Sequence, residues 1–415
     1  MNKNIKLAVA GAIFAAASAA QAGIIIPAGD WTLDINGNVN GFANYTRADG
    51  QRGGDFTTGT GTTFASGSSA QIAASPDVGP NANKALGINT GLLPSWLGFT
   101  GTTRQNDVDV SFTISMQPNV SDNTMAGDNK APLFRQTFLT FGDKSWGSIK
   151  LGKDIGIFAS DAILNDMTLL GVGGGAVGAN GPSGNATSLG GIGTGYIYAA
   201  WKGQIAYTTP NFNGFQATVG ITNPNQVQSS TAAASTIRQD QYGYEAKASY
   251  SFAANDVTGK VWVSGASYDN QTSATVANDI RVMDIGANLN VAGFGLTGYY
   301  YDGKGAGTTL LGAYGVSADN QRRDSDGGYV QLTYATPFKT KLGAAWGVSN
   351  LDTAGNDDRT NRSVLKSNER ITIGAYHPLT KHLNLVAEYN NIKTDAHGGG
   401  EAESNTYSGG AILFF

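Results

Sequence analysis

The stretch DVDVSFTISMQ, residues 107–117, alternates strictly between polar and apolar side chains. Val108, Val110, Phe112, Ile114 and Met116 hold the even positions, and only Asp, Ser, Thr and Gln hold the odd ones. Successive side chains of a β-strand point to opposite faces, whereas those of a helix repeat every 3.6 residues. The pattern therefore predicts a strand with one apolar and one polar face.

The same period of two returns along the whole chain. It is clearest in residues 31–45, 242–252, 283–291, 330–334, 342–348, 371–375, 383–389 and 407–415. With shorter runs such as FRQTFLTF and WKGQIAYTT, about sixteen candidate strands can be counted. An even number of that size is typical of the closed antiparallel barrels of bacterial outer membranes.

The composition excludes several classes of protein. The chain has no cysteine, so it can form no disulfide framework, thiolate metal site or iron–sulfur cluster. Its 3 histidines, at 377, 382 and 397, lie near the end of the chain without a recognisable serine motif, which disfavours a hydrolase triad. A formal net charge of −4 disfavours nucleic acid as a partner. We expect no enzymatic activity, metal or cofactor.

The N-terminal residues 1–22, MNKNIKLAVAGAIFAAASAAQA, read as a secretory signal peptide. Two lysines precede an apolar, alanine-rich stretch, and Ala20-Gln21-Ala22 forms a small-x-small cleavage site. Cleavage after Ala22 would leave residues 23–415 as one exported domain. Removing Lys3 and Lys6 would change the net charge from −4 to −6. No later segment offers 18 uninterrupted apolar residues for a transmembrane helix.

The alternation by itself fits either a soluble β-protein or a membrane barrel. The export signal, strands of about ten residues and a polar face poor in Lys and Glu favour the barrel. Long polar segments at 46–94, 226–239, 269–278, 304–326 and 351–368 alternate with tight turns at 210–214 and 255–256. This rhythm is typical of outer-membrane barrels, whose loops are long on one side only.

Four runs, in this order, resemble the general porins of Gram-negative outer membranes: WLGFTGTTRQNDVDVSFTISMQ, FRQTFLTFGDKSWGSIKLGKDIGIF, IAYTTPNFNGFQATVGI, and HPLTKHLNLVAEYNN followed by AILFF. The resemblance covers most of the chain after residue 22. It implies a sixteen-stranded barrel, homotrimeric assembly, and a third external loop folded into the pore.

The same resemblance assigns roles around that loop, which we expect at about residues 154–196. Asp166 falls where such porins carry a pore-facing acid, and Leu170 replaces a second acid. Arg135 matches one arginine of a basic ladder on the barrel wall, and Lys202 lies near another and should point into the lumen by strand parity. Two further ladder positions are occupied by Asn38 and Trp96. These six residues are the expected pore constriction.

Strand parity adds expectations for five residues. Lys150 and Asp109 should also face the lumen. Gln136 and Thr140 should face outward, where a neighbouring subunit would cover them. The terminal Phe415 shares its parity with the apolar face and resembles the signal that the barrel-insertion machinery reads.

The sequence therefore predicts an outer-membrane channel for passive diffusion of small hydrophilic solutes and ions. Its expected partners are the lipid bilayer, lipopolysaccharide and the insertion machinery. The nearest alternative is a substrate-selective channel with a saturable site for small organic acids or aromatic solutes. An outer-membrane enzyme and a secreted soluble adhesin or lectin are more distant alternatives.

Overall fold

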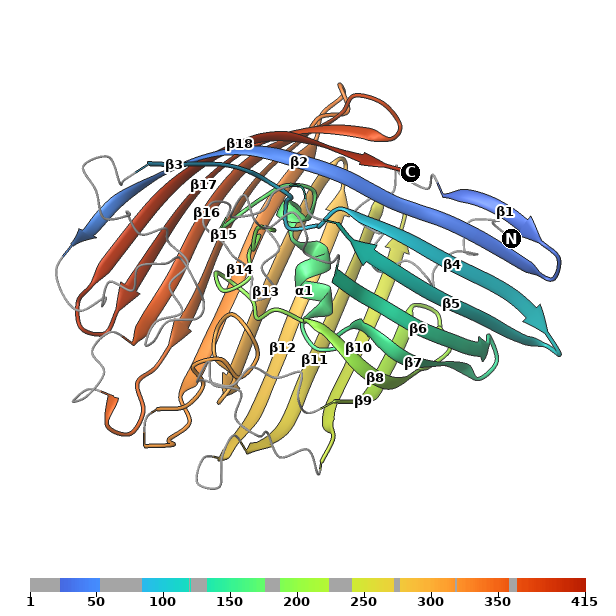
Figure 1. Ribbon diagram of the computed structural model, residues 1–415, viewed down its shortest axis with the longest axis horizontal. Coiled ribbons are helices and arrows are strands. Elements are labelled where there is room, and N and C mark those ends of the chain that lie inside the picture. The colour runs from blue at the N-terminus through green and yellow to red at the C-terminus, as the bar shows by residue number, and fades with distance from the viewer. Residues whose placement is uncertain are drawn as a thin grey trace.

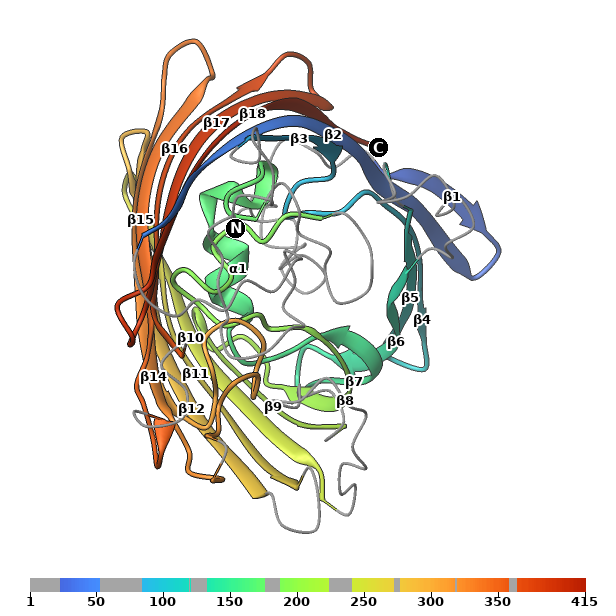
Figure 2. The same ribbon diagram turned by 60° about the vertical axis from the view of Figure 1, so that its left-hand side comes forward.

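A computed structural model describes residues 23–52, 84–118, 120, 133–175, 187–223, 241–271, 277–317, 319–357 and 364–415. The expected signal peptide, residues 1–22, lies outside the described residues. Within them the chain forms one antiparallel sheet, closed on itself (Figures 1 and 2). Among the described residues no helix has the length and apolarity needed to cross a membrane.

The strands follow one another with few interruptions. They are β1 (Ile24–Ala28), β2 (Trp31–Arg52), β3 (Lys84–Asn89), β4 (Trp96–Gln105), β5 (Val108–Gln117), β6 (Leu133–Asp143), β7 (Gly147–Ile155), β8 (Trp201–Thr208), β9 (Phe215–Thr222), β10 (Gly243–Ala254), β11 (Val257–Gln271), β12 (Ala277–Val291), β13 (Phe294–Lys304), β14 (Asp324–Ala335), β15 (Lys341–Leu351), β16 (Leu365–Pro378), β17 (Leu383–Ala396) and β18 (Glu401–Phe414). Between β7 and β8 lie α1 (Ser160–Asn165) and the 3-10 helix η3 (Met167–Leu170).

The long strand β2 closes the barrel. One edge of β2 pairs with β18, and the other pairs with β4. In the described part of the chain, β2 and β4–β18 form a ring of sixteen strands, while β1 and β3 pair with β2 alone. The chain ends beside its beginning, because the backbone N–H of Phe415 donates to the carbonyl of Gly37 at 3.0 Å. The predicted sixteen-stranded antiparallel barrel is confirmed.

The two faces of each strand differ as the alternation predicts. On β12, Met283 and Ile285 point outward and are 69% and 58% exposed, whereas Asp284 between them is buried inside the barrel. Short turns such as Asn255-Asp256 join strands at one rim, and Asn255 adopts a left-handed φ of 53° there. The long connections lie at the other rim. Apolar side chains thus cover the outer wall.

One expectation about side-chain direction is wrong. Gln136 points inward and donates to Asp154 at 3.1 Å, and Thr140 pairs with Ser111 and Lys150 on the same inner face. The cause is an irregularity between Ser115 and Met116, where β6 carries one residue more than β5. An extra residue reverses the parity of a strand beyond it. These side chains therefore give no support for a subunit interface.

The largest apolar cluster lies inside the barrel. The described residues between β7 and β8, 156–175 and 187–200, fold inward with α1 and η3, and we call them the inward loop (Figure 2). Phe158, Ile197 and Tyr196 of this loop are fully buried against wall residues such as Trp262 and Tyr299. The loop therefore packs against one side of the lumen like a core element.

The assignment of the outward face to lipid can be tested by placing a charged side chain on it. Ile285→Arg should destabilise the folded protein in lipid by about 2–4 kcal/mol, because the guanidinium would enter the hydrocarbon near mid-depth. Asn288→Arg, on the inner face of the same strand, should cost no more than about 1 kcal/mol, the value of its hydrogen bond to Thr297. Reversible unfolding in lipid vesicles measures both, and equal losses would contradict the assignment of faces.

Candidate pore constriction

The inward loop is held by backbone hydrogen bonds to carboxylates of the barrel wall. Glu245 on β10 accepts the N–H groups of Ile157 and Phe158 at 2.7 and 3.0 Å. Glu388 on β17 accepts those of Val172 and Gly173 at 2.9 and 2.8 Å. A loop folded into the lumen exposes backbone donors that would otherwise lack partners, and these wall acids supply acceptors for them.

Neutral wall side chains hold further points of the loop. Ser264, Gln331 and Ser349 accept the N–H groups of Ala159, Met167 and Gly195, respectively. Five strands between β10 and β17 thus supply these anchors, and the lumen that the described residues of the loop leave free lies toward β5–β7. Figure 1 shows α1 inside the barrel.

Asp166 closes the inward loop on itself. Its carboxylate accepts the N–H groups of Thr168 and Gly191 and the hydroxyl of Tyr196, each at 2.9 Å. The guanidinium of Arg370 on β16 lies 3.8 Å away. A Cβ at Gly191 would lie 2.7 Å from both charged groups, so the loop needs a glycine there. Asp166 is 3% exposed and differs from the expected pore-facing acid, because its oxygens are occupied within the protein.

Lys202 points inward, as parity predicts, but it is not in contact with water. It is fully buried, forms an ion pair with Glu245, and its Nζ lies 5.5 Å from the centre of the Tyr268 ring. Lys202 therefore neutralises a carboxylate that anchors the loop. The sequence indicated its direction, whereas its partner, 43 residues away, depends on the pairing of β8 through β10.

Trp96, Asn38 and Leu170 meet at the junction of β2, β4 and the inward loop. Trp96 is 9% exposed and packs edge-on against Phe414, with ring centres 6.5 Å apart. Leu170 packs against the same cluster. Asn38 is buried and donates to the carbonyl of Pro94 at 3.0 Å. The structure thus brings these three predicted residues together, in a packed corner of the barrel.

Two predicted residues lie on neighbouring strands, Arg135 on β6 and Lys150 on β7. Lys150 pairs with Asp154, keeps a 32% exposed side chain, and has its Nζ 4.9 Å from the centre of the Phe138 ring. Arg135 is half-buried at the irregularity of β6, and among the described residues its guanidinium has no ion pair. Asp109 lies near the short turn of β4 and β5, where it binds Arg104 at 2.8 Å. It therefore lies away from the inward loop.

Sequence reasoning missed a second group of charges. Asp161 on α1 contacts Lys247 at 3.0 Å and also forms an ion pair with Lys260. The carboxylate is 6% exposed, but the lysines are 21% and 31% exposed. A signal was present in YEAKASY, where Glu245 and Lys247 share a face otherwise formed by small residues. No group of three or more acidic or histidine side chains in the described residues could hold a metal ion.

The pKa of Asp161 is lowered from its ordinary 3.8. Burial alone would raise this pKa, but the charges of Lys247 and Lys260 more than offset the loss of hydration. The ion pairs therefore stabilise the fold fully above pH 3.8, and this contribution is lost as pH falls through the lower, folded-state pKa.

Asp161→Asn should accordingly destabilise the protein by about 2 kcal/mol at pH 7, less than a fully buried pair because both lysines keep contact with water. The difference from the natural protein should shrink as pH falls below 3.8. Thermal unfolding of both proteins over a pH series measures this. A difference independent of pH would show that the carboxylate charge contributes nothing.

The fold is that of known outer-membrane channels. It is similar to the anion-selective porin from Comamonas acidovorans (TM-score 0.61, 14% identity, 93% of this chain and 100% of that chain). It is also similar to the outer-membrane channel DcaP of Acinetobacter baumannii (TM-score 0.63, 17% identity, 93% of this chain and 97% of that chain). A third similar structure is OmpT of Vibrio cholerae (TM-score 0.57, 12% identity, 94% of this chain and 100% of that chain).

The family is shown by the sequence itself. No individual curated protein matches the chain. The profile described as Gram-negative porin, however, matches residues 7–397. Because this match spans nearly the whole chain, the protein belongs to the Gram-negative porins, a family of outer-membrane channels and not of enzymes.

Proposed function

We propose that the channel is a passive one for small hydrophilic solutes and ions, constricted by the inward loop, and that it favours anions. The supporting observation is a division of charge. The acids around the loop, Asp154, Asp161, Asp166, Glu245 and Glu388, are each at most 5% exposed. Their carboxylates are therefore shielded from the water path.

Several basic groups, in contrast, keep contact with the lumen. Lys150, Lys247 and Lys260 have side chains that are 32%, 21% and 31% exposed. Arg135 is half-buried at the irregularity of β6, the strand next to that of Lys150, and adds a fourth positive charge. Charges in a narrow water-filled passage with protein walls act on ions more strongly than charges on an open surface. A passage whose acids are buried and whose bases are exposed attracts anions. The similar porin from Comamonas acidovorans is described as anion-selective.

The remaining parts of the proposal concern assembly. Residues 1–22 act as a cleaved signal peptide, and Phe415 as the residue recognised by the insertion machinery. The mature chain assembles as a homotrimer in contact with lipopolysaccharide. A trimer form is named among the similar structures, for OmpT of Vibrio cholerae. On the outer wall, Tyr407 and Leu413 are 55% and 42% exposed, as a membrane-facing C-terminal strand requires.

A substrate-selective channel for small organic acids is the second candidate. One observation favours it: Lys150 lies over Phe138, next to the free lumen. An aromatic carboxylate would bind there with its charge at Lys150 and its ring against Phe138.

Selectivity should follow the exposed bases. Arg135→Gln combined with Lys150→Gln should lower the anion-to-cation permeability ratio about threefold, since each screened charge contributes a few tenths of a kcal/mol. Reversal potentials in planar bilayers under a salt gradient measure the ratio. Lys366→Gln, which removes an exposed lysine of β16, far around the ring from β6 and β7, is the control. An unchanged ratio in the double variant would contradict anion selection by these residues.

The second candidate predicts saturable inhibition. Benzoate should reduce the chloride current in a saturable way, and acetate should not, because acetate lacks a ring. Phe138→Leu should weaken the benzoate effect by about threefold to tenfold, the value of one aromatic contact. Current recorded against solute concentration decides between the two candidates. A benzoate effect that rises linearly would leave general diffusion alone.

A further inference from the structure

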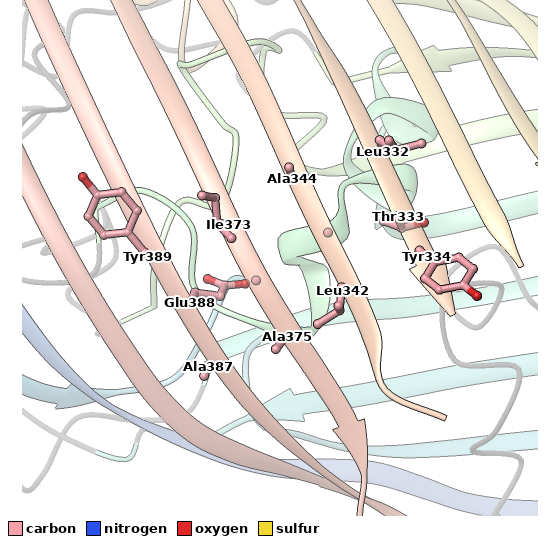
Figure 3. A pocket seen from close by; sticks show the side chains of 12 residues that line it. Leu332, Thr333, Tyr334, Leu342, Ala344, Ile373, Ala375, Ala387, Glu388 and Tyr389 are labelled. Carbon is pink, nitrogen blue, oxygen red and sulfur yellow. The ribbon is translucent and has the colours of Figure 1, made fainter. Parts of the chain in front are cut away.

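The outer wall carries a groove across β14–β17. It has a volume of about 530 Å³ and is open to the outside. Its floor is formed by the small side chains of Ala344, Ala375 and Ala387, and its flanks by Leu332, Leu342, Ile373, Tyr334 and Tyr389. Figure 3 looks onto this outer groove with the inward loop behind the strands. Glu388 also borders it, but its carboxylate binds the inward loop.

The outer groove lies in the half of the membrane near the short turns. Tyr334 is two residues from the β14–β15 turn, and Tyr389 is six residues from the start of β17. Six residues extend about 20 Å along a strand, or about 15 Å across the membrane when the strand is tilted. This is one leaflet of a hydrocarbon core of about 30 Å. Short turns of outer-membrane barrels face the periplasm, so the groove faces the periplasmic leaflet.

Basic side chains border the periplasmic end of this groove. Lys339 in the β14–β15 turn and Lys381 in the β16–β17 turn are exposed, and neither has an ion pair among the described residues. The turns, residues 336–340 and 379–382, contain no acid. The C-terminal carboxylate of Phe415 accepts the N–H of Gly37 on β2 at 2.8 Å. We call Lys339 and Lys381 the basic rim.

Apolar side chains project from the same turns. Phe338 is 83% exposed and Leu379 is 55% exposed. Exposed apolar residues next to lysines are typical of segments that enter the headgroup region of a membrane, where the lysines reach the phosphates. The basic rim therefore lies at the depth of lipid phosphates, directly below an apolar groove.

A second outer groove provides a natural contrast. It crosses β9–β13, has the same volume of about 530 Å³, and also has small residues, Ala248, Ala287 and Gly298, among its lining. The turns below it contain Asp256 and no lysine. The two grooves thus share shape and apolarity, and they differ in the charge at the periplasmic end.

We propose that the outer groove and the basic rim form a site for an anionic phospholipid of the periplasmic leaflet. An acyl chain occupies the alanine-floored groove, and the phosphate group lies between Lys339 and Lys381. Charge complementarity selects the headgroup, because two unpaired lysines attract a net negative lipid more strongly than a zwitterionic one. The lipid stays bound to the outer wall and is not a solute that the channel transports.

Native mass spectrometry of the delipidated protein tests the site. Phosphatidylglycerol should bind more tightly than phosphatidylethanolamine with the same acyl chains. Lys339→Gln with Lys381→Gln should weaken phosphatidylglycerol binding by about fivefold for each lysine and remove the preference. Lys144→Gln, which changes a lysine in the β6–β7 turn on the distant wall, should have no effect. Single-channel conductance in the natural range verifies that each variant is folded.

A second pair of variants tests the groove itself. Ala344→Phe should fill the outer groove and lower phosphatidylglycerol binding, whereas Ala287→Phe in the contrasting groove should not. Equal binding of both lipids, equal loss in Lys144→Gln, or unchanged binding in Ala344→Phe would overturn the proposal. So would competition by glycerophosphate without acyl chains, which would indicate a soluble anion site. Dissociation of oligomers by Ala344→Phe would instead assign the groove to a second copy of the chain.

Discussion

A polypeptide surrounded by hydrocarbon must pair all of its backbone N–H and C=O groups within the protein. Each unpaired group costs several kcal/mol in the absence of water, so an open sheet edge is not tolerated at membrane depth. The ring of β2 and β4–β18 meets this constraint by pairing β2 with both β18 and β4. The closed ring then determines that one set of side chains contacts lipid and the other encloses water.

The same constraint acts inside the lumen. A loop folded into the barrel introduces backbone donors without strand partners, and wall side chains supply the acceptors. Glu245 and Glu388 bind such donors directly, and Asp166 binds those of the returning arm. These acids are buried by this role, and Lys202 is buried with Glu245. The lysines that pair with Asp154 and Asp161, in contrast, keep part of their surface in water. The hydrogen bonds and ion pairs that hold the loop thus determine which charged groups are buried and which contact water.

The sequence predicts well which face of a strand a side chain occupies, but it predicts poorly which residues that side chain contacts. The inward direction of Lys202 follows from strand parity, but its burial against Glu245 depends on the inward loop lying above both. Gln136 was assigned to the wrong face because one extra residue in β6 reverses the parity, and the position of that residue depends on the pairing of β6 with β5. Trp96 was expected at the constriction, and its contact with Phe414 depends on the meeting of the first and last strands of the ring.

The amino-acid sequence by itself determined the strand period, the number of strands, the asymmetry of long and short connections, and hence the barrel. These properties are local, since each depends on a few neighbouring residues. Only the tertiary structure decided which charges contact water. Asp166 and Lys150 are both recognised as charged residues from the sequence alone. In the structure, however, Asp166 is enclosed by the loop, whereas Lys150 borders the lumen. Burial depends on contacts between residues far apart in the chain, and no local pattern encodes it.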